Sequence, residues 1–174
     1  MTWIVLLRAV NVGGTGKLLM AELRAALEQA GAGDVASYIQ SGNLIFTLAQ
    51  DDPRRVENWV GDVIETRFGF RPGVMAFSGD DLTRALARDP WPGVGDPKYT
   101  LLSFFTGVPD DTAMDVLAQY STAGEQIVLG ERCLYVRYPN GSGTSKLTSR
   151  IEPALGCPAT ARNLNTVRKI HAML

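Results

Sequence analysis

The chain has 174 residues, of which 45% are hydrophobic and 20% are charged, an ordinary globular composition. No apolar stretch approaches the roughly 20 residues that a membrane-spanning helix needs, so we expect no membrane protein. Two cysteines indicate a reducing, cytoplasmic environment. A single histidine excludes a multi-histidine metal site, so the sequence predicts no metal and suggests no cofactor.

The net charge of −1 hides an uneven distribution. Residues 50–131 carry seven basic and fourteen acidic side chains, whereas residues 132–174 carry seven basic side chains and one acidic. The C-terminal quarter therefore has a positive local field. This field either balances the acidic middle of the chain or attracts an anionic partner.

The first half predicts the element order β-α-β-β-α-β. The apolar run from Trp3 to Arg8 is typical of a central strand that is buried on both faces. Gly42-Asn43 between two β-prone runs indicates a hairpin. The predicted strands are 3–8, 35–40, 44–48 and 73–77, and the predicted helices are 20–30 and a helix that opens at 51–53.

A helix at 81–88 and a Pro- and Gly-rich connector follow, and then the same order recurs. The predicted strands are 99–105, 126–129, 133–138 and 157–161. The predicted helices are 110–120, 146–155, which Pro153 should kink or split, and a terminal helix from 164.

This order predicts an α+β protein made of two ferredoxin-like halves, each a mainly antiparallel sheet with its helices on one face. We expect a first half at 1–79, a helix and connector at 80–97, and a second half with an extra C-terminal helix at 98–174. In such a half, the first-strand exit and the central hairpin share one sheet edge, which places loop 9–17 beside residues 41–43. The third- and fourth-strand exits share the opposite edge, which places residues 144–146 beside 162–166. The clusters thus form two sites, or one if the halves pack these edges together.

Polar clusters follow these predicted strands, in loops where binding residues usually lie. They contain amides, hydroxyls and positive charges but no nucleophile–base pair, which favours anion binding. The candidate ligand-binding residues are Arg8, Asn11, Gly13, Gly14, Lys17, Ser41, Asn43, Ser145, Lys146, Arg162, Asn163, Asn165 and Thr166.

Each cluster also has a purely structural interpretation. A P-loop would need Gly at position 11 and Ser or Thr at position 18, where this chain has Asn11 and Leu18, so a P-loop NTPase is excluded. The structural interpretation of residues 11–17 is a flexible connection between a strand and a helix. Turn chemistry alone explains residues 41–43. Thr144 or Ser145, and Asn163, are natural helix N-caps. Capping does not account for Arg162, whose planar fork suits a carboxylate or a phosphate.

Several stretches together resemble the domain-of-unknown-function 1697 family of bacterial proteins. They are Leu6 to Gly14, Met20 to Leu23, Tyr38 to Asn43, Ser145-Lys146 and Ala159 to Val167. Ala9 stands where the family usually has Gly, and Leu164 where Trp is common. The resemblance implies a duplicated ferredoxin-like α+β fold and a site formed by the motif residues, and it implies no activity.

Our leading hypothesis is a protein that binds a phosphorylated or carboxylated small molecule, nucleotides included. The second is a transferase-like or hydrolytic enzyme acting on such a ligand by positioning and electrostatics, which lacks an evident general base. The third is nucleic-acid binding through the basic C-terminal quarter, which a pI of about 5.8 and the lack of an aromatic stacking pattern disfavour.

Overall fold

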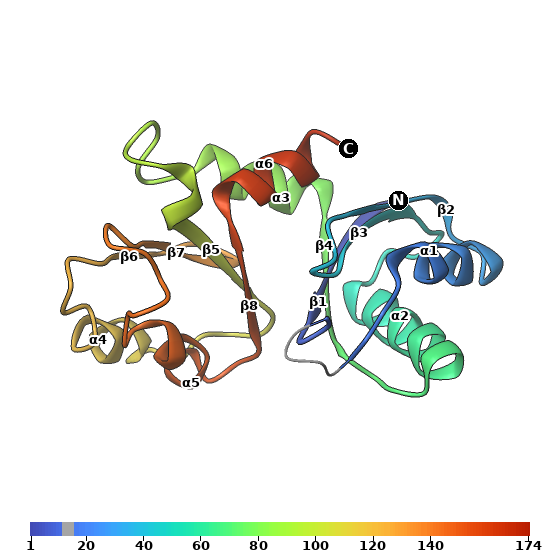
Figure 1. Ribbon diagram of the computed structural model, residues 1–174, viewed down its shortest axis with the longest axis horizontal. Helices are drawn as coiled ribbons and strands as arrows, with labels where there is room; N and C mark the ends of the chain where they lie inside the picture. Colours follow the sequence, from blue (N-terminus) through green and yellow to red (C-terminus); the bar gives the residue numbers. More distant parts are fainter. Residues whose placement is uncertain (12–15) are drawn as a thin grey trace. The chain divides into compact units, whose positions relative to one another are not determined.

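The computed structural model describes residues 1–11 and 16–174 (Figure 1). The predicted ligand residues Gly13 and Gly14 lie outside the described residues. The chain divides into two compact units, which we call the N-terminal unit (residues 1–82 and 169–174) and the C-terminal unit (residues 83–168). Each unit contains one four-stranded antiparallel sheet, as predicted for an α+β protein with two ferredoxin-like halves.

The N-terminal unit has the predicted order of elements, and β1 is a central strand of its sheet. The strand order is β2-β3-β1-β4. The elements are β1 (Thr2–Arg8), α1 (Met20–Gln29), β2 (Gly33–Tyr38), β3 (Asn43–Thr47), α2 (Pro53–Phe68) and β4 (Gly73–Ser78).

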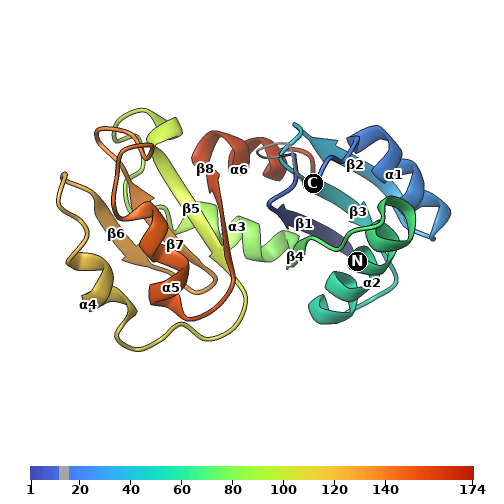
Figure 2. The ribbon, with the colours of Figure 1, turned by 60° about the horizontal axis from the view of Figure 1, so that its bottom comes forward.

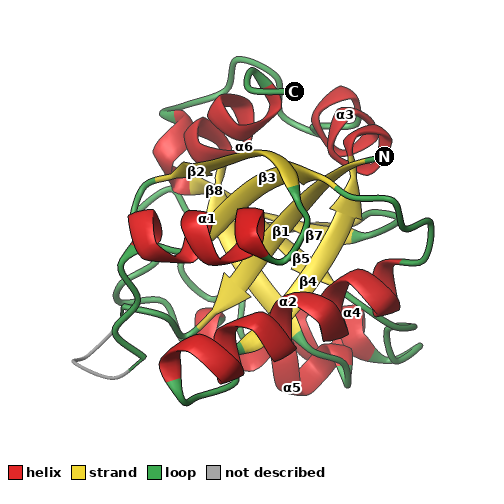
Figure 3. Cartoon of the chain, turned by 90° about the vertical axis from the view of Figure 1, so that its right-hand side faces the viewer, coloured by secondary structure: helices red, strands yellow, loops and turns green. Residues whose placement is uncertain are grey.

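Helices α1 and α2 cover one face of this sheet, as Figure 3 shows. Their apolar stripes pack against every second residue of β1, namely Trp3, Val5 and Leu7. Helix α2 begins where the Asp52 side chain accepts a hydrogen bond from the Arg54 N–H at 2.9 Å. The acid and proline at 52–53 therefore do what the sequence predicts, which is to start a helix.

The C-terminal unit repeats the plan with the strand order β6-β7-β5-β8 (Figure 2). Its core lies between the sheet and the helices α4 and α5, and contains Phe105, Leu117, Val136, Leu147 and Leu155. The elements are β5 (Thr100–Phe105), α4 (Ala113–Ala118), β6 (Gln126–Leu129), β7 (Cys133–Arg137), α5 (Ile151–Leu155) and β8 (Ala159–Asn163), with 3-10 turns at Pro97–Tyr99 and Thr148–Arg150. Helix α6 (Leu164–His171) begins in this unit and ends within residues 169–174, which belong to the N-terminal unit.

The predicted helix over 146–155 is wrong in its first half. Leu147, Ile151 and Leu155 are all buried, as the helical spacing indicated, but α5 begins only at Ile151 after the 3-10 turn. This start puts Pro153 in the first helical turn, where its missing N–H needs no acceptor. Neither Thr144 nor Ser145 caps a helix, because no helix begins there.

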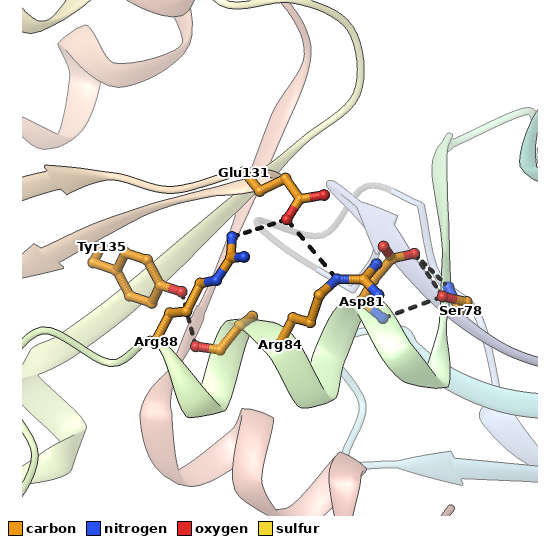
Figure 4. Close-up of polar contacts among 7 residues, drawn as sticks. Ser78, Asp81, Arg84, Arg88, Glu131 and Tyr135 are labelled. Atoms are coloured by element: carbon orange, nitrogen blue, oxygen red, sulfur yellow. Dashed lines mark hydrogen bonds and ion pairs between the residues drawn. The ribbon is translucent and has the colours of Figure 1, made fainter.

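Helix α3 (Gly79–Ala87) is anchored by side chains near both of its ends (Figure 4). In the N-terminal unit, the Asp81 N–H donates to Ser78 Oγ at 3.1 Å, and the Asp81 carboxylate accepts from the Ser78 N–H at 2.9 Å, a reciprocal N-terminal cap. In the C-terminal unit, the Tyr135 hydroxyl donates to the carbonyl of Ala85 at 2.8 Å, and Arg88 pairs with Glu131 at 2.9 Å.

Candidate functional site

The described residues that follow β1, 9–11 and 16–18, lie beside the hairpin between β2 and β3, as the sheet topology predicts. The Leu7 N–H donates to the Gly42 carbonyl at 2.8 Å. A Cβ at Gly42 would lie 2.7 Å from side-chain atoms of Leu7 and Val10, so only glycine fits. We call residues 8–11, 16–18 and 39–43 the N-terminal corner.

Asn11 joins the two arms of this corner. Its Nδ2 donates to the carbonyls of Leu18 at 2.9 Å and Gln40 at 2.7 Å, and its Oδ1 accepts from the Leu18 N–H at 2.8 Å. Its own N–H donates to the Gly16 carbonyl at 3.1 Å. The amide that the sequence offered as a ligand group is thus bonded to the backbone on three sides.

Asn43 is likewise engaged within the corner. It is fully buried, and its Nδ2 donates to the Tyr38 carbonyl at 2.9 Å and to Ser41 Oγ at 3.0 Å. The turn interpretation of residues 41–43 therefore accounts for both polar side chains.

Left-handed backbone is concentrated at the same corner. Ala9, Asn11 and Ile39 have φ angles of 54°, 55° and 52°, and they are three of the four non-glycine residues with positive φ in the described part of the chain. Alanine and a β-branched residue such as isoleucine rarely adopt this conformation. The corner therefore holds a strained backbone in place.

The corner contains two basic residues, Arg8 and Lys17. Arg8 is half-buried, and its aliphatic stem covers Gly73, where a Cβ would lie 3.1 Å from Arg8 Cδ. Lys17 is exposed, and it follows Gly16, whose Cβ position would lie 2.9 Å from the carbonyl oxygen of Ala9. The backbone of the Lys17 arm is thus held against the end of the strand that carries Arg8.

The strand exits of the C-terminal unit share one edge as predicted, because β7 and β8 are both antiparallel to β5. The residues that follow β7 nevertheless lie on the helix-covered side. The Ser145 hydroxyl donates to Glu125 Oε1 and accepts from the Leu147 N–H at 3.2 Å, and Leu147 is buried in the core below α4 and α5. Lys146 is exposed.

Arg162 projects from the opposite face of this sheet. Its cross-strand partner is Leu102. The neighbouring Leu101 packs on the helix-covered core, and because side chains alternate along a strand, Leu102 and Arg162 lie on the other face of the sheet. The Arg162 guanidinium donates to Thr160 Oγ1 at 2.9 Å and to the Ala161 carbonyl at 2.8 Å. Burial lowers the pKa of Arg162 to about 10, so it remains a cation at neutral pH.

The remaining residues of this cluster divide between capping and exposure. Asn163 Oδ1 accepts from the Thr166 N–H at 2.8 Å, so Asn163 caps α6, as its alternative interpretation held. Thr166 is buried, and Asn165 is exposed.

The contact between Ser145 and Glu125 could not be predicted from the sequence. The hydrogen bond from Ser145, helped by backbone N–H donors, lowers the pKa of the Glu125 carboxyl. The two residues are 20 positions apart in two different loops, and no pattern in the sequence links them. An acid beside Ser145 is unfavourable for anion binding at that hydroxyl.

Comparisons with known proteins show the family and support the fold. The family described as "Protein of unknown function (DUF1697)" matches residues 1–135, a span that contains the whole N-terminal corner. The chain belongs to the DUF1697 family. This DUF1697 chain is also similar to the solved structure of the conserved bacterial protein SP0830 from Streptococcus pneumoniae, with 26% identity and a TM-score of 0.75. The match covers 99% of this chain and 97% of that one. A search of curated proteins gave no match.

The described part of this DUF1697 protein contains neither a candidate metal site nor a candidate membrane-spanning helix. Residues 1–11 and 16–174 contain no group of three or more His, Cys, Asp or Glu side chains placed to hold a metal ion. None of the helices described is long and apolar enough to cross a membrane.

Proposed function

We propose that the protein binds a small anionic ligand, a phosphorylated or carboxylated molecule such as a nucleotide, at the N-terminal corner. The observation that carries this proposal is the concentration of left-handed backbone at Ala9, Asn11 and Ile39. Such conformations are costly and collect at ligand-binding sites, where the surrounding structure holds them. The hydrogen bonds of Asn11 supply that surrounding structure here.

The ligand's charge would be met by Arg8 and Lys17, the two basic residues of the corner. Arginine can bind a phosphate or carboxylate through two parallel bonds, while lysine acts as a mobile point charge. Asn11 and Asn43 are bonded to their own chain, so their part in binding is to hold the corner's shape. Ligand affinity would then depend on the Arg8 and Lys17 side chains, and the free energy of unfolding would depend on the two asparagine amides.

Arg162 and Asn165 remain predicted ligand residues of a second site in the C-terminal unit, whereas Lys146 follows β7 on the helix-covered side and remains a predicted ligand residue apart from them. The exposed Asn165 amide and the desolvated Arg162 support this prediction. An enzymatic role is less well supported, because the lowered pKa of Glu125 makes it a poor general base for Ser145. Nucleic-acid binding through the basic residues of 132–174 predicts an affinity that falls steeply with salt.

The test is isothermal titration of the wild type with inorganic phosphate, pyrophosphate, citrate, AMP and ATP. For the ligand that binds, we expect Lys17→Ala to weaken affinity by about 10-fold, the effect of losing one interaction of about 1.4 kcal/mol. Lys98→Ala is the matched control, since Lys98 is also an exposed lysine but belongs to the other unit, where it is paired with Asp96 at 3.2 Å. Full affinity in both Lys17→Ala and Arg8→Ala, with a loss in Arg162→Ala, would move the site to the C-terminal unit and refute the corner.

A further inference from the structure

Strand β6 has an apolar edge that none of the other described strands covers. It is the first strand in the order β6-β7-β5-β8, so one side of its backbone has no ladder partner. Val128 and Leu129 are 38% and 39% exposed, and they are the only strand residues among the exposed large hydrophobic side chains of the described chain. Apolar edge strands are sites of pairing with a further strand.

The backbone groups that face outward can be assigned from the hydrogen bonds to β7. The Gly130 N–H donates to the Cys133 carbonyl at 2.8 Å, and the register pairs Val128 with Tyr135. Because hydrogen-bonding direction alternates along a strand, Gly130, Val128 and Gln126 face β7. Ile127 and Leu129 therefore present their N–H and C=O groups to the open side.

We infer that β6 pairs antiparallel with β6 of a second copy of this chain, about a two-fold axis at Val128, to form one continuous eight-stranded sheet. In this register, Ile127 of each copy exchanges both backbone hydrogen bonds with Leu129 of the other. The outward groups of the strand are thus matched by an identical strand. A closed two-fold interface of this kind is self-complementary, as most homodimer interfaces are.

The side chains fit the same register. Val128 meets Val128 of the second copy in a pair without backbone bonds, where Cα atoms lie about 4.5 Å apart and side chains approach most closely. Ile127 meets Leu129, so the cross-strand pairs of the seam are aliphatic. Just beyond the strand, Glu125 faces the second copy's Glu131. Their repulsion is reduced, because Glu131 is paired with Arg88 at 2.9 Å and with Arg84 at 3.9 Å.

Sedimentation equilibrium of the full chain, from about 10 μM to about 1 mM, covers the affinities expected of so small an interface. We expect the wild type to dimerise in this range and Val128→Lys to stay monomeric with an unchanged circular dichroism spectrum. Val108→Lys is the matched control, because Val108 is an 88% exposed valine in a loop of the same unit. A wild type that stays monomeric throughout, or a dimer that Val128→Lys leaves intact, overturns the inference. Pairing with the edge strand of a different protein would appear as a monomeric wild type.

Cross-linking tests the register separately. Val128→Cys places two thiols across the axis within disulfide reach, whereas Gln126→Cys places them about 13–14 Å apart, four residues along the strand. The native Cys133 and Cys157 are both buried and serve as a common background. We expect an oxidised dimer from Val128→Cys only. Equal yields from both variants would refute the two-fold register.

Discussion

Replacing Asn11 with alanine tests whether the corner is held by this one side chain. The change removes three hydrogen bonds, of 2.9, 2.7 and 2.8 Å, and leaves the buried Leu18 N–H without its acceptor. Neutral hydrogen bonds contribute about 0.5–1.5 kcal/mol each, and those here are partly exposed. Alanine at φ 55° adds backbone strain that asparagine tolerates better. Together these losses predict a cost of roughly 2–4 kcal/mol.

Two further substitutions of Asn11 separate these contributions. Glycine removes the bonds but not the ease of the left-handed conformation, so Asn11→Gly should cost about 1 kcal/mol less than Asn11→Ala. Aspartate keeps the acceptor for the Leu18 N–H but turns a carboxylate toward the carbonyls of Leu18 and Gln40, which accept from Nδ2 in the native protein. Asn11→Asp should therefore destabilise at neutral pH and recover as the carboxyl is protonated.

The assay is urea unfolding followed by tryptophan fluorescence, to which Trp3 and Trp59 of the N-terminal unit contribute. With a slope of about 2 kcal/mol per molar urea, Asn11→Ala should lower the midpoint by about 1–2 M. Asn58→Ala is the control, because Asn58 is exposed on α2, where alanine is the better helix former. Equal midpoints for the Asn11→Ala and Asn58→Ala variants would refute the role assigned to Asn11.

Three other predictions each rest on a single structural feature. Ala9→Gly should raise the free energy of unfolding by about 0.5–1 kcal/mol in urea titrations, because glycine adopts a φ of 54° without strain. Gly42→Ala should lower it by roughly 2–4 kcal/mol, since its Cβ would overlap Leu7 at 2.7 Å and its φ is 77°. The bond between Ser145 and Glu125 depresses the folded-state pKa of the carboxyl, so its stabilisation is present above the ordinary value of 4.5 and is lost as pH falls through the depressed value. Ser145→Ala should therefore weaken the pH dependence of the urea midpoint as pH falls below the ordinary carboxyl value of 4.5.

Each of the three has a matched control in the chain. Ala25→Gly, at an exposed position of α1, should destabilise by about 1 kcal/mol, and the same sign at position 9 would contradict the strain argument. Gly69 has φ 76° and nothing within 4 Å of its Cβ position, so the excess cost of Gly42→Ala over Gly69→Ala measures the overlap alone. Ser149 is exposed and makes only a 3.4 Å bond to the Lys146 carbonyl. A Ser149→Ala variant with the same pH response as Ser145→Ala would remove Glu125 from the explanation.

The order of elements could be predicted from sequence because it depends on local patterns. The apolar run of β1 and the Gly42-Asn43 turn each indicate one structure whatever surrounds them. The error at 146–155 shows the limit of such patterns. Periodic spacing of Leu147, Ile151 and Leu155 reports which residues are buried, but it does not report which N–H groups are bonded along a helix. The two differ here because the turn before α5 is set by Ser145 and its bond to a distant loop.

The proximity of the two arms of the N-terminal corner could be predicted from sequence, whereas the hydrogen-bond partners of its asparagines could not. A loop asparagine has the same donors and acceptors whether its partner is a ligand or a backbone carbonyl, so composition cannot distinguish the two. The structure assigns Asn11, Asn43 and Asn163 to backbone partners. These partners lie in other elements or across a turn, which a linear pattern does not reveal.

This assignment makes the roles of the polar residues experimentally separable. Asn11, with three bonds to the backbone, has little capacity left to recognise a ligand, and truncating it should change stability before it changes affinity. Lys17 is exposed, so its truncation should leave stability within about 0.5 kcal/mol and alter affinity alone. If truncation of Asn11 and of Lys17 lowered affinity only in proportion to the lost stability, the N-terminal corner would serve to stabilise the fold, and the anion would have to bind elsewhere.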